Sequence, residues 1–208
     1  VKTRTGIVLK DAPDEYSNLD FLFRLVDTLV ESGCQRLYLH ARVAVLEGLS
    51  PAQNRDIPPL TPEKGEAIKL RHPDLELILN GGITHLANAL APLTWADGIM
   101  IGRAAYHRPR FLSELEQNLY DTDFRIDESA IFDRYVAYMS TQLNQGVKLN
   151  ILTKHLLHCF SGKPGARRYR QILSDSKRLN ANDFNLVHEA HSALGLHTAQ
   201  TEVGLNAG

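Results

Sequence analysis

Two short glycine-containing strings each follow an apolar run of strand-like residues. The first is Asn80-Gly81-Gly82, and the second is Gly102-Arg103. Glycine lets a backbone approach an anion closely, and backbone N–H groups at the start of a following helix donate hydrogen bonds to it. Arg103 adds a charge-assisted partner that can be bidentate. The two strings therefore predict a phosphate-binding site, with glycines that serve only tight turns as the alternative.

Cations and a histidine stand at two further predicted strands. Lys2 and Arg4 alternate with threonines, so the two cations share a face of their strand. A lysine directed into a sheet is costly to bury unless it meets an anion, such as a flavin ring that gains negative charge on reduction. An edge lysine that reaches solvent is the alternative. His40 and Arg42 end the next strand, where His40 is either a cofactor ligand or a satisfied core histidine.

The elements that position these residues alternate between short apolar strands and amphipathic helices. We expect strands at 2–8, 36–40, 75–79 and 97–101, helices at 19–31 and from 62 to before Pro73, and a long loop at 43–60. Such alternation predicts parallel β/α architecture. Phosphate-binding exits at two consecutive strands are typical of the last two strands of a (β/α)8 barrel.

Four strands are half of such a barrel, and the pattern changes to helices alone further along. We therefore expect the C-terminal half of a (β/α)8 barrel over residues 1–120 and a small all-helical domain over 121–208. The helices are predicted at 127–145, 150–160, 165–177 and 183–194, with Asp127 and Asp183 as N-caps. We also expect a frayed tail after Gly195. The first four strands would lie upstream of Val1, and the open strand edges would favour self-association.

Composition bounds the class of protein. The chain has 208 residues, a formal net charge of −1, 43% hydrophobic and 23% charged residues. It contains no apolar run of the roughly 18 residues that a membrane helix needs, so we expect no membrane partner. Cys34 and Cys159 lie far apart without a C-x-x-C or metal-ligand pattern. They predict buried structural thiols, no metal site and a reducing, cytoplasmic setting.

Positive charge is concentrated at residues 148–178, where eight Lys or Arg stand against one acid, Asp175. Arg167 and Arg170 are three apart and share a face of the predicted helix. Phosphate backbones attract such a stripe, and Tyr169 is placed to stack on a base. The alternative is an ordinary solvated helix face.

Taken together, these strings resemble the A-type branch of the tRNA-dihydrouridine synthases, over the chain to about residue 194. The matching segments are Lys2-Thr3-Arg4-Thr5-Gly6-Ile7, His40-Ala41-Arg42, Gly48-Leu49-Ser50-Pro51, Asn54-Arg55-Asp56-Ile57-Pro58-Pro59-Leu60, Ile78-Leu79-Asn80-Gly81-Gly82-Ile83, Asp97-Gly98-Ile99-Met100-Ile101-Gly102-Arg103-Ala104-Ala105-Tyr106 and Pro164-Gly165-Ala166-Arg167.

The resemblance implies a TIM barrel with FMN at its carboxyl-end face and a helical domain that binds tRNA. NADPH would reduce FMN, and hydride would then reach the 5,6 double bond of a D-loop uridine near position 20. The implied FMN contacts are Lys2, His40, Asn80, Gly81, Gly82, Gly102 and Arg103, with the last two at the phosphate. The implied tRNA contacts are Arg55, Arg167 and Arg170.

The family's general acid is a cysteine on a loop that would lie upstream of Val1. Neither Cys34 nor Cys159 matches that motif, so we expect no catalytic residue in this chain, and the activity of the chain by itself stays open. One alternative is a catalytically inactive tRNA-binding module. Another is an FMN barrel acting on a small molecule, such as a dihydroorotate dehydrogenase. The complete enzyme is expected to be a monomer.

Overall fold

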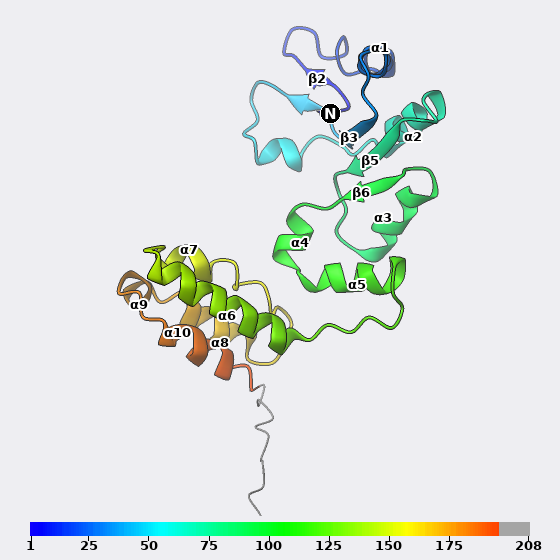
Figure 1. Cartoon of the computed structure of the whole chain (residues 1–208). Coiled ribbons are helices and arrows are strands. Elements are labelled where there is room, and N and C mark those ends of the chain that lie inside the picture. Colours follow the sequence, from blue (N-terminus) through cyan, green and yellow to red (C-terminus); the bar gives the residue numbers. More distant parts are fainter. Residues whose placement is uncertain (196–208) are drawn as a thin grey trace, which may run out of the picture. The chain divides into compact units, whose positions relative to one another are not determined.

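A computed structural model describes residues 1–195, so the frayed tail predicted after Gly195 lies outside the described residues. The chain divides into two compact units, Val1–Ala105 and Tyr106–Gly208 (Figure 1). The division predicted from the pattern of elements falls somewhat later, at residue 120. Strands occur in the first unit, and the described part of the second unit is helical.

The first unit is built on a four-stranded parallel sheet. Its strands are β1 (Lys2–Arg4), β3 (Arg36–His40), β5 (Glu76–Asn80) and β6 (Gly98–Met100), in the order β1-β3-β5-β6. All three pairings are parallel and follow chain order without a reversal. A doubly wound sheet would reverse its strand order, whereas a barrel does not. The predicted α/β class and partial barrel are confirmed, and the barrel is not closed.

Helices cover one face of this sheet. They are α1 (Leu19–Glu31), α2 (Pro62–Arg71) and α3 (Leu86–Leu90), and α4 (Arg103–His107) follows β6. Two short 3-10 helices, η1 (Gln53–Arg55) and η2 (Ala91–Thr94), lie in the connections. Leu37 and Leu77 of the sheet share a fully buried core with Leu22 and Val26 of α1. Asn18 caps α1 by accepting a hydrogen bond from the Phe21 N–H (2.8 Å).

The predicted first strand, 2–8, is interrupted at Gly6. Residues after it form β2 (Ile7–Val8), which pairs with β4 (Ala44–Val45) in a separate two-stranded sheet. Gly6 adopts φ +150°, and the carbonyl of Tyr16 packs so closely that a Cβ at Gly6 would clash with it. The Ile7 N–H donates to that same carbonyl (2.9 Å). A contact with a distant loop therefore ends the strand.

The second unit contains α5 (Arg110–Leu119), α6 (Glu128–Asn144), α7 (Leu149–Thr153), α8 (Ala166–Leu173), α9 (Ser176–Asn180) and α10 (Asn185–Ser192). α8 and α10 lie side by side (Figure 1). The core of this unit brings together Phe132, Met139, Leu149, Tyr169 and Leu186.

Two predicted helices of this unit are shorter than expected. The helix predicted at 150–160 ends at Thr153, and turns follow it. The helix predicted at 165–177 divides because Asp175 caps a new helix, accepting from the backbone of Lys177 and Arg178. The predicted N-cap Asp127 is confirmed by its hydrogen bond from Ala130 (2.9 Å).

The prediction for Asp183 was wrong by one position, because Phe184 is the N-cap of α10. Asp183 lies just before it and accepts from the Asn185 N–H (3.2 Å) and from Arg178 Nε (2.7 Å). Across residues 1–195, no helix combines the length and the apolar character needed to cross a bilayer.

Leu77→Ala tests the core of the first unit. Leu77 is fully buried in the central strand β5, so we expect a loss of about 2–5 kcal/mol of unfolding free energy. The chain's one tryptophan, Trp95, packs against this core and reports unfolding by fluorescence in urea. Leu70→Ala is the matched control, since Leu70 is 78% exposed and its truncation should change stability by about 0.5 kcal/mol or less. Equal effects of the two substitutions would contradict the assigned core.

Candidate functional site

The face of the sheet that α1 and α2 leave uncovered carries a transverse row of polar side chains at the strand ends. Arg4 of β1 pairs in register with His40 of β3, and His40 pairs with Asn80 of β5. Side chains alternate along a strand, so these three share a face, opposite the buried Leu39 and Leu79. The structure therefore brings the predicted residues His40 and Asn80 together at the carboxyl edge.

His40 is a neutral histidine among cations. Burial lowers its pKa most, and the positive charges of Arg4, Arg42, Lys2 and Arg103 lower it further, to about 4. Four cations within electrostatic reach of one imidazole form a strongly anion-attracting environment. His40 keeps one ring N–H as a donor and one ring nitrogen as an acceptor near neutral pH.

The glycines after β5 are required by close contacts. Gly81 has φ +110°, and a Cβ there would lie 2.7 Å from Cδ2 of His40. Gly82 has φ +69°, and a Cβ there would clash with the Leu60 side chain. Both positions combine a backbone conformation that disfavours other residues with a neighbour that leaves no room. The imidazole of His40 thus packs directly over the Gly81 backbone.

The second strand exit is open. Among residues 1–195, no heavy atom would lie within 4 Å of a Cβ at Gly102, so its backbone is accessible from outside. Asn80 at the first exit donates a hydrogen bond from Nδ2 to the carbonyl of Met100, which lies just before the second exit (2.7 Å). The two predicted exits are thereby tied together, and Gly102 and Arg103 continue directly from β6.

The loop at residues 43–60 is held against the strand ends by arginine side chains. Arg4 donates from Nη1 to the carbonyl oxygens of Val43 (2.7 Å) and Asn54 (2.9 Å). Asn54 in turn exchanges two hydrogen bonds of 2.7 Å with the backbone of Val45. Carbonyl oxygens carry partial negative charge, so these contacts offset part of the repulsion among the cations.

Arg42 makes the same kind of contact and has one further donor. Its Nη1 donates to the carbonyl oxygens of Asp56 (3.2 Å) and Pro58. Its Nε is buried and has no hydrogen-bond acceptor among residues 1–195. A buried donor without a partner costs about 1–3 kcal/mol. The strand-end site therefore favours a ligand that can accept hydrogen bonds.

Arg103 forms a bidentate ion pair with Asp56 of the same loop. Its Nη2 and Nη1 lie 2.7 and 3.0 Å from the carboxylate oxygens, and Nη2 also donates to the carbonyl of Arg55 (3.4 Å). Arg103 lowers the pKa of the Asp56 carboxyl group, chiefly through this hydrogen bond. Both side chains are more than half exposed, so water and salt screen the pair and it contributes little to stability. An incoming phosphate can therefore compete for Arg103 at little cost.

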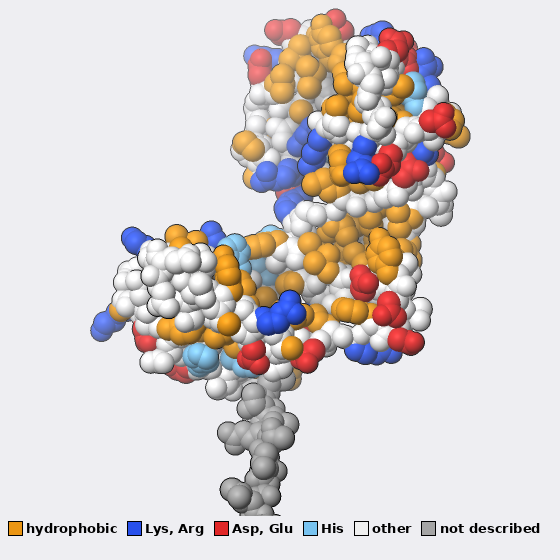
Figure 2. Space-filling view, in the orientation of Figure 1, with side chains coloured by type: hydrophobic (Ala, Val, Ile, Leu, Met, Phe, Trp, Pro, Cys, Tyr) orange, Lys and Arg blue, Asp and Glu red, His pale blue; other side chains and the backbone are white. Residues whose placement is uncertain are grey.

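Sequence reasoning missed Asp56, and it did not anticipate that Arg4 and Arg42 fasten the 43–60 loop. The Arg4–Asn54 and Arg103–Asp56 contacts join residues 50 and 47 positions apart. All of these contacts end in an irregular loop, where no periodic pattern marks them. Lys2 and Arg55 are both exposed. Figure 2 shows blue Lys and Arg side chains gathered on the part of this unit where the loop lies.

The basic segment of the second unit offers fewer free cations than its composition suggests. Lys163 forms an ion pair with Glu128, and Arg178 pairs with Asp183 (2.7 Å) and Glu189 (2.5 Å). These two cations stabilise the unit internally and do not belong to an exposed stripe.

On α8, Arg167 and Arg168 are exposed and Arg170 is half-buried. No ion pair among residues 1–195 holds any of the three. The prediction that Tyr169 stacks on a base was wrong, because its ring is buried and its hydroxyl donates to the carbonyl of Leu156 (3.1 Å). The periodicity that places the arginines outside places Tyr169 in the core.

Neither cysteine lies in the strand-end site. Cys34 is half-buried, with Sγ 3.4 Å from the carbonyl of Arg36. Cys159 is half-buried in the second unit, where burial raises the pKa of its thiol. Burial thus keeps the Cys159 thiol protonated near neutral pH, and neither thiol is placed to serve the strand-end site.

The fold and site define a class: a partial parallel barrel with a cationic, glycine-lined carboxyl edge, followed by a helical unit with exposed arginines. The chain belongs to the dihydrouridine synthase family (Dus), whose sequence pattern matches residues 1–194.

Its similar curated relatives are named tRNA-dihydrouridine(20/20a) synthase. The chain is 37% identical to the protein of Shewanella oneidensis, over 93% of this chain and 56% of the relative. It is 40% identical to that of Xanthomonas axonopodis pv. citri, over 91% and 55%. For Pseudomonas putida the identity is 41%, over 84% and 50%. The chain therefore spans about half the length of these relatives.

We expect His40 to titrate with a pKa near 4 and this pKa to rise when an anion binds, because negative charge stabilises the imidazolium. The free histidine pKa is about 6.5. Between pH 6.5 and 4 the unfolded chain therefore binds more protons than the folded one, and stability falls as pH falls through that window. Above it, His40 contributes no pH dependence. NMR of the imidazole with and without inorganic phosphate measures this, and titration of His40 near pH 6.5 would refute the cationic site.

Proposed function

We propose that this chain forms the FMN-phosphate side and the tRNA-binding unit of a tRNA-dihydrouridine synthase. The reaction is reduction of the 5,6 double bond of a D-loop uridine, at position 20 or 20a as in the names of its relatives. The proposal rests on family membership and on one observation above all. A neutral His40 lies among four cations at the carboxyl edge of a parallel sheet.

The residues of the first unit fit a flavin mononucleotide. A dianionic phosphate matches the charge of Arg103, the open backbone at Gly102 and the glycine turn at Gly81-Gly82. The buried Nε of Arg42 is a further donor that an anionic cofactor suits. In this assignment Asn80 contacts the ribityl-phosphate region, which its position at the exit of β5 supports.

Lys2 and His40 are assigned to the flavin ring. Their shared face of the sheet supports this, as Lys2 pairs in register with Tyr38, two residues before His40. When bound, FMN supplies hydride chemistry, through which electrons from NADPH reach C6 of the uridine. Lys2 would hold negative charge on the pyrimidine side of the ring. His40, being neutral, would orient the ring by hydrogen bonding without adding charge.

Protonation of uridine C5 is assigned to a cysteine that these residues do not include. Cys34 and Cys159 are half-buried thiols away from the carboxyl ends of the strands, and burial raises the pKa of Cys159. Loss of such a general acid typically costs about 10²–10⁴-fold in rate. We accordingly assign no catalytic residue to residues 1–195 and propose a reducing, cytoplasmic setting for both thiols.

The tRNA contacts are assigned to Arg55, Arg167 and Arg170. Arg55 is exposed in a loop whose backbone the site arginines hold, so its position is restricted before RNA arrives. Arg167 and Arg170 lie one turn apart on α8 without ion-pair partners among residues 1–195. Preorganised, unpaired cations are well suited to phosphate contacts. A tRNA-binding module without flavin is the second candidate, favoured by the separate core of the second unit.

The flavin assignment predicts a loss of FMN binding in two variants. Arg103→Ala removes one charge-assisted partner and should weaken binding about tenfold. Gly81→Ala should abolish most binding, because its Cβ displaces the His40 ring at a position with φ +110°. The visible absorbance and fluorescence of added FMN measure both.

Gly33→Ala is the control for backbone strain. Gly33 also has a positive φ (+89°), but a Cβ there meets no other atom of the described part of the chain within 4 Å. It should lower stability without changing FMN affinity. If the unmodified chain binds no FMN while tRNA binding persists, the flavin assignment fails and the RNA-binding module remains.

The tRNA assignment predicts that Arg167→Ala with Arg170→Ala weakens tRNA binding and flattens its salt dependence. Removal of one arginine–phosphate interaction should lower the slope of log K against log salt by about 1, so the pair should lower it by about 2. Filter binding or fluorescence anisotropy across a salt series measures the slope.

Arg24→Ala with Arg134→Ala is the matched control, because both arginines are exposed and the same charge is removed. This control should leave the slope within error of the unmodified chain. Equal slopes for the two double variants would show that only net charge matters and would remove the contact role of Arg167 and Arg170.

A further inference from the structure

A tyrosine and three histidines of the second unit form a cluster that includes none of the residues assigned to flavin or tRNA. Tyr106 and His107 end α4, and His155 and His158 stand in the turns after α7. All four residues belong to the second unit. Tyr106, His107 and His155 are exposed and His158 is half-buried, so a ligand in solvent can reach the cluster.

The Tyr106 ring holds the three imidazoles by edge contacts. Its centroid lies 5.4 Å from that of His107, 5.8 Å from that of His155 and 5.9 Å from that of His158. The Tyr106 hydroxyl donates to the carbonyl of Lys154 (3.4 Å) and lies 3.3 Å from Nδ1 of His155. These contacts restrict the directions in which the imidazoles point.

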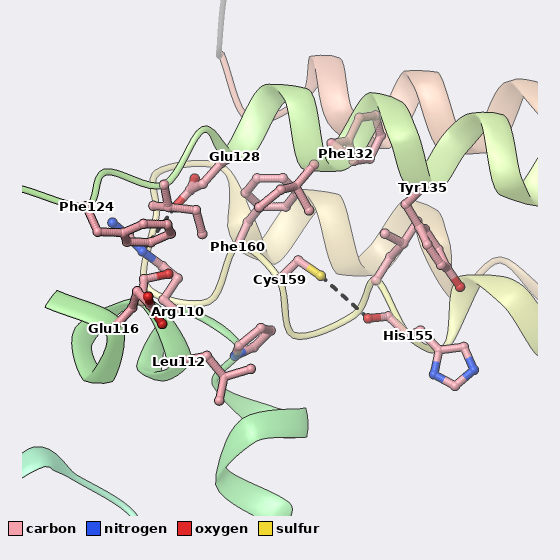
Figure 3. Close-up of a pocket in the computed structure, with 15 residues that line it drawn as sticks. Arg110, Leu112, Glu116, Phe124, Glu128, Phe132, Tyr135, His155, Cys159 and Phe160 are labelled. Atoms are coloured by element: carbon pink, nitrogen blue, oxygen red, sulfur yellow. Dashed lines mark hydrogen bonds and ion pairs between the residues drawn. The ribbon is translucent and has the colours of Figure 1, made fainter. Parts of the chain in front are cut away.

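His155 is fixed from the interior of the unit while its ring lies outside. The Cys159 thiol donates to the carbonyl of His155 (3.5 Å), as the dashed line in Figure 3 marks. Figure 3 also shows the His155 ring pointing away from Phe132 and Phe160, which line an apolar cavity. The packed interior therefore supports the cluster and directs it outward.

His107 and His158 share one hydrogen bond. Nδ1 of His107 lies 3.2 Å from Nε2 of His158, and the two rings are perpendicular, with centroids 4.7 Å apart. One of these two nitrogens carries the shared proton and the other accepts it. The outer nitrogens, Nε2 of His107 and Nδ1 of His158, have no hydrogen-bond partner in the described part of the chain.

Protonation changes what this imidazole pair offers to solvent. In the neutral pair, one outer nitrogen is a donor and the other is an acceptor. With one added proton, the pair keeps its internal hydrogen bond, gains a positive charge and has a donor at both outer nitrogens. Two donors with a positive charge match a phosphate, whereas one donor beside one acceptor does not.

Positive charge acts on His158 from two sides. Burial lowers its pKa most, and the charges of His107 and of Arg170 on α8 lower it further. A negative group bound beside the pair would oppose the effect of these charges. Binding of an anion and uptake of a proton therefore favour each other. Because Arg170 is assigned to tRNA, a phosphate of that RNA is the anion that this position favours.

The other charged side chains near the pair contact one another or a backbone carbonyl. Those that line the cavity beside His158 are Arg108, Arg110, Glu114 and Arg125. Arg108 lies 3.7 Å from Glu114, and Arg110 lies 3.0 Å from Glu128. Arg125 donates to the carbonyl of Phe124 (2.8 Å). These opposite charges largely offset each other, so the cavity itself is no anion site.

Imidazole is the side-chain type of this cluster that titrates between pH 6 and pH 8. Burial raises the pKa of the neighbouring Cys159 thiol, which therefore stays protonated there. Phenol, guanidinium, ammonium and carboxyl groups ordinarily titrate outside this range. A pH dependence that arises at the cluster would therefore come from its histidines.

A metal ion fits the cluster less well than an oxyanion does. Across residues 1–195, no group of three or more His, Cys, Asp or Glu is arranged to hold a metal ion. The imidazole pair instead uses one nitrogen of each ring for its internal hydrogen bond. Its outer N–H groups are suited to accept an oxygen ligand as hydrogen-bond donors.

We infer that the His107–His158 pair is a proton-dependent contact for a phosphate of tRNA and takes up one proton from solvent when the RNA binds. The added proton makes both outer nitrogens donors and gives the pair a positive charge that the phosphate stabilises. The inference rests on the proposed tRNA-binding function and extends it to residues outside the Arg167 and Arg170 assignment.

The inference predicts tighter tRNA binding at lower pH. A complex that holds more protons than its free components is favoured as pH falls. Between pH 8 and pH 6 the affinity should rise several-fold, towards a limit of about tenfold for one charge-assisted hydrogen bond. Fluorescence anisotropy with labelled tRNA at constant ionic strength measures the change.

Two variants locate the titrating group. His107→Gln keeps a neutral hydrogen-bonding side chain but removes the imidazole pair, so it should leave the affinity at pH 8 nearly unchanged and abolish most of the gain at pH 6. His188→Gln is the matched control, because His188 is exposed on α10 of the same unit. It should keep the full gain. An equal loss at both pH values in His107→Gln, or equal pH profiles of the two variants, would overturn the inference.

Calorimetry of the unmodified chain counts the proton without dependence on variant folding. Titration with tRNA at pH 6.5, in two buffers of different ionisation enthalpy, gives the number of protons taken up per complex. We expect a net uptake that His107→Gln reduces and His188→Gln does not. Binding of tRNA without proton uptake would overturn this inference and leave the tRNA assignment intact. Absence of tRNA binding at every pH would overturn both.

Discussion

Repulsion among cations is the constraint on which the strand-end site depends. The sheet register and the chain after β3 and β6 bring Lys2, Arg4, Arg42 and Arg103 within electrostatic reach of His40. So many like charges at one edge need compensation, and the 43–60 loop provides it through backbone carbonyls and one carboxylate. The loop therefore offsets part of the repulsion among these cations. Because most of that compensation comes from neutral carbonyls, the edge stays attractive to an external anion.

Local signals sufficed to predict the elements that frame this edge. The helix at 19–31 and the strand at 36–40 have the bounds predicted, because apolar residues at helical spacing mark the helix and a short apolar run marks the strand. The alternation of strands and helices along the chain predicted a parallel sheet. The observed strand order, β1-β3-β5-β6, agrees with a barrel segment. His40, Asn80 and the glycines could be placed together because carboxyl ends of parallel strands meet at one edge.

The predictions failed where distant residues decide the conformation. The strand at 2–8 breaks at Gly6 because the Tyr16 carbonyl fills the space that a side chain would need. Asp56 stands in an irregular loop, and nothing in its neighbourhood shows that Arg103, 47 positions later, is its partner.

The number of cations in a segment of sequence differs from the number that stay exposed and unpaired in the folded protein. The segment at 148–178 looks uniformly basic, yet Lys163 and Arg178 are paired with carboxylates that lie outside it. The arginines that remain exposed on α8 are Arg167 and Arg168. Burial of Tyr169 fixes the helix on the core and so fixes the direction of its arginines. Internal ion pairs thus reduce a broad basic segment to a few exposed cations whose direction is fixed by the core.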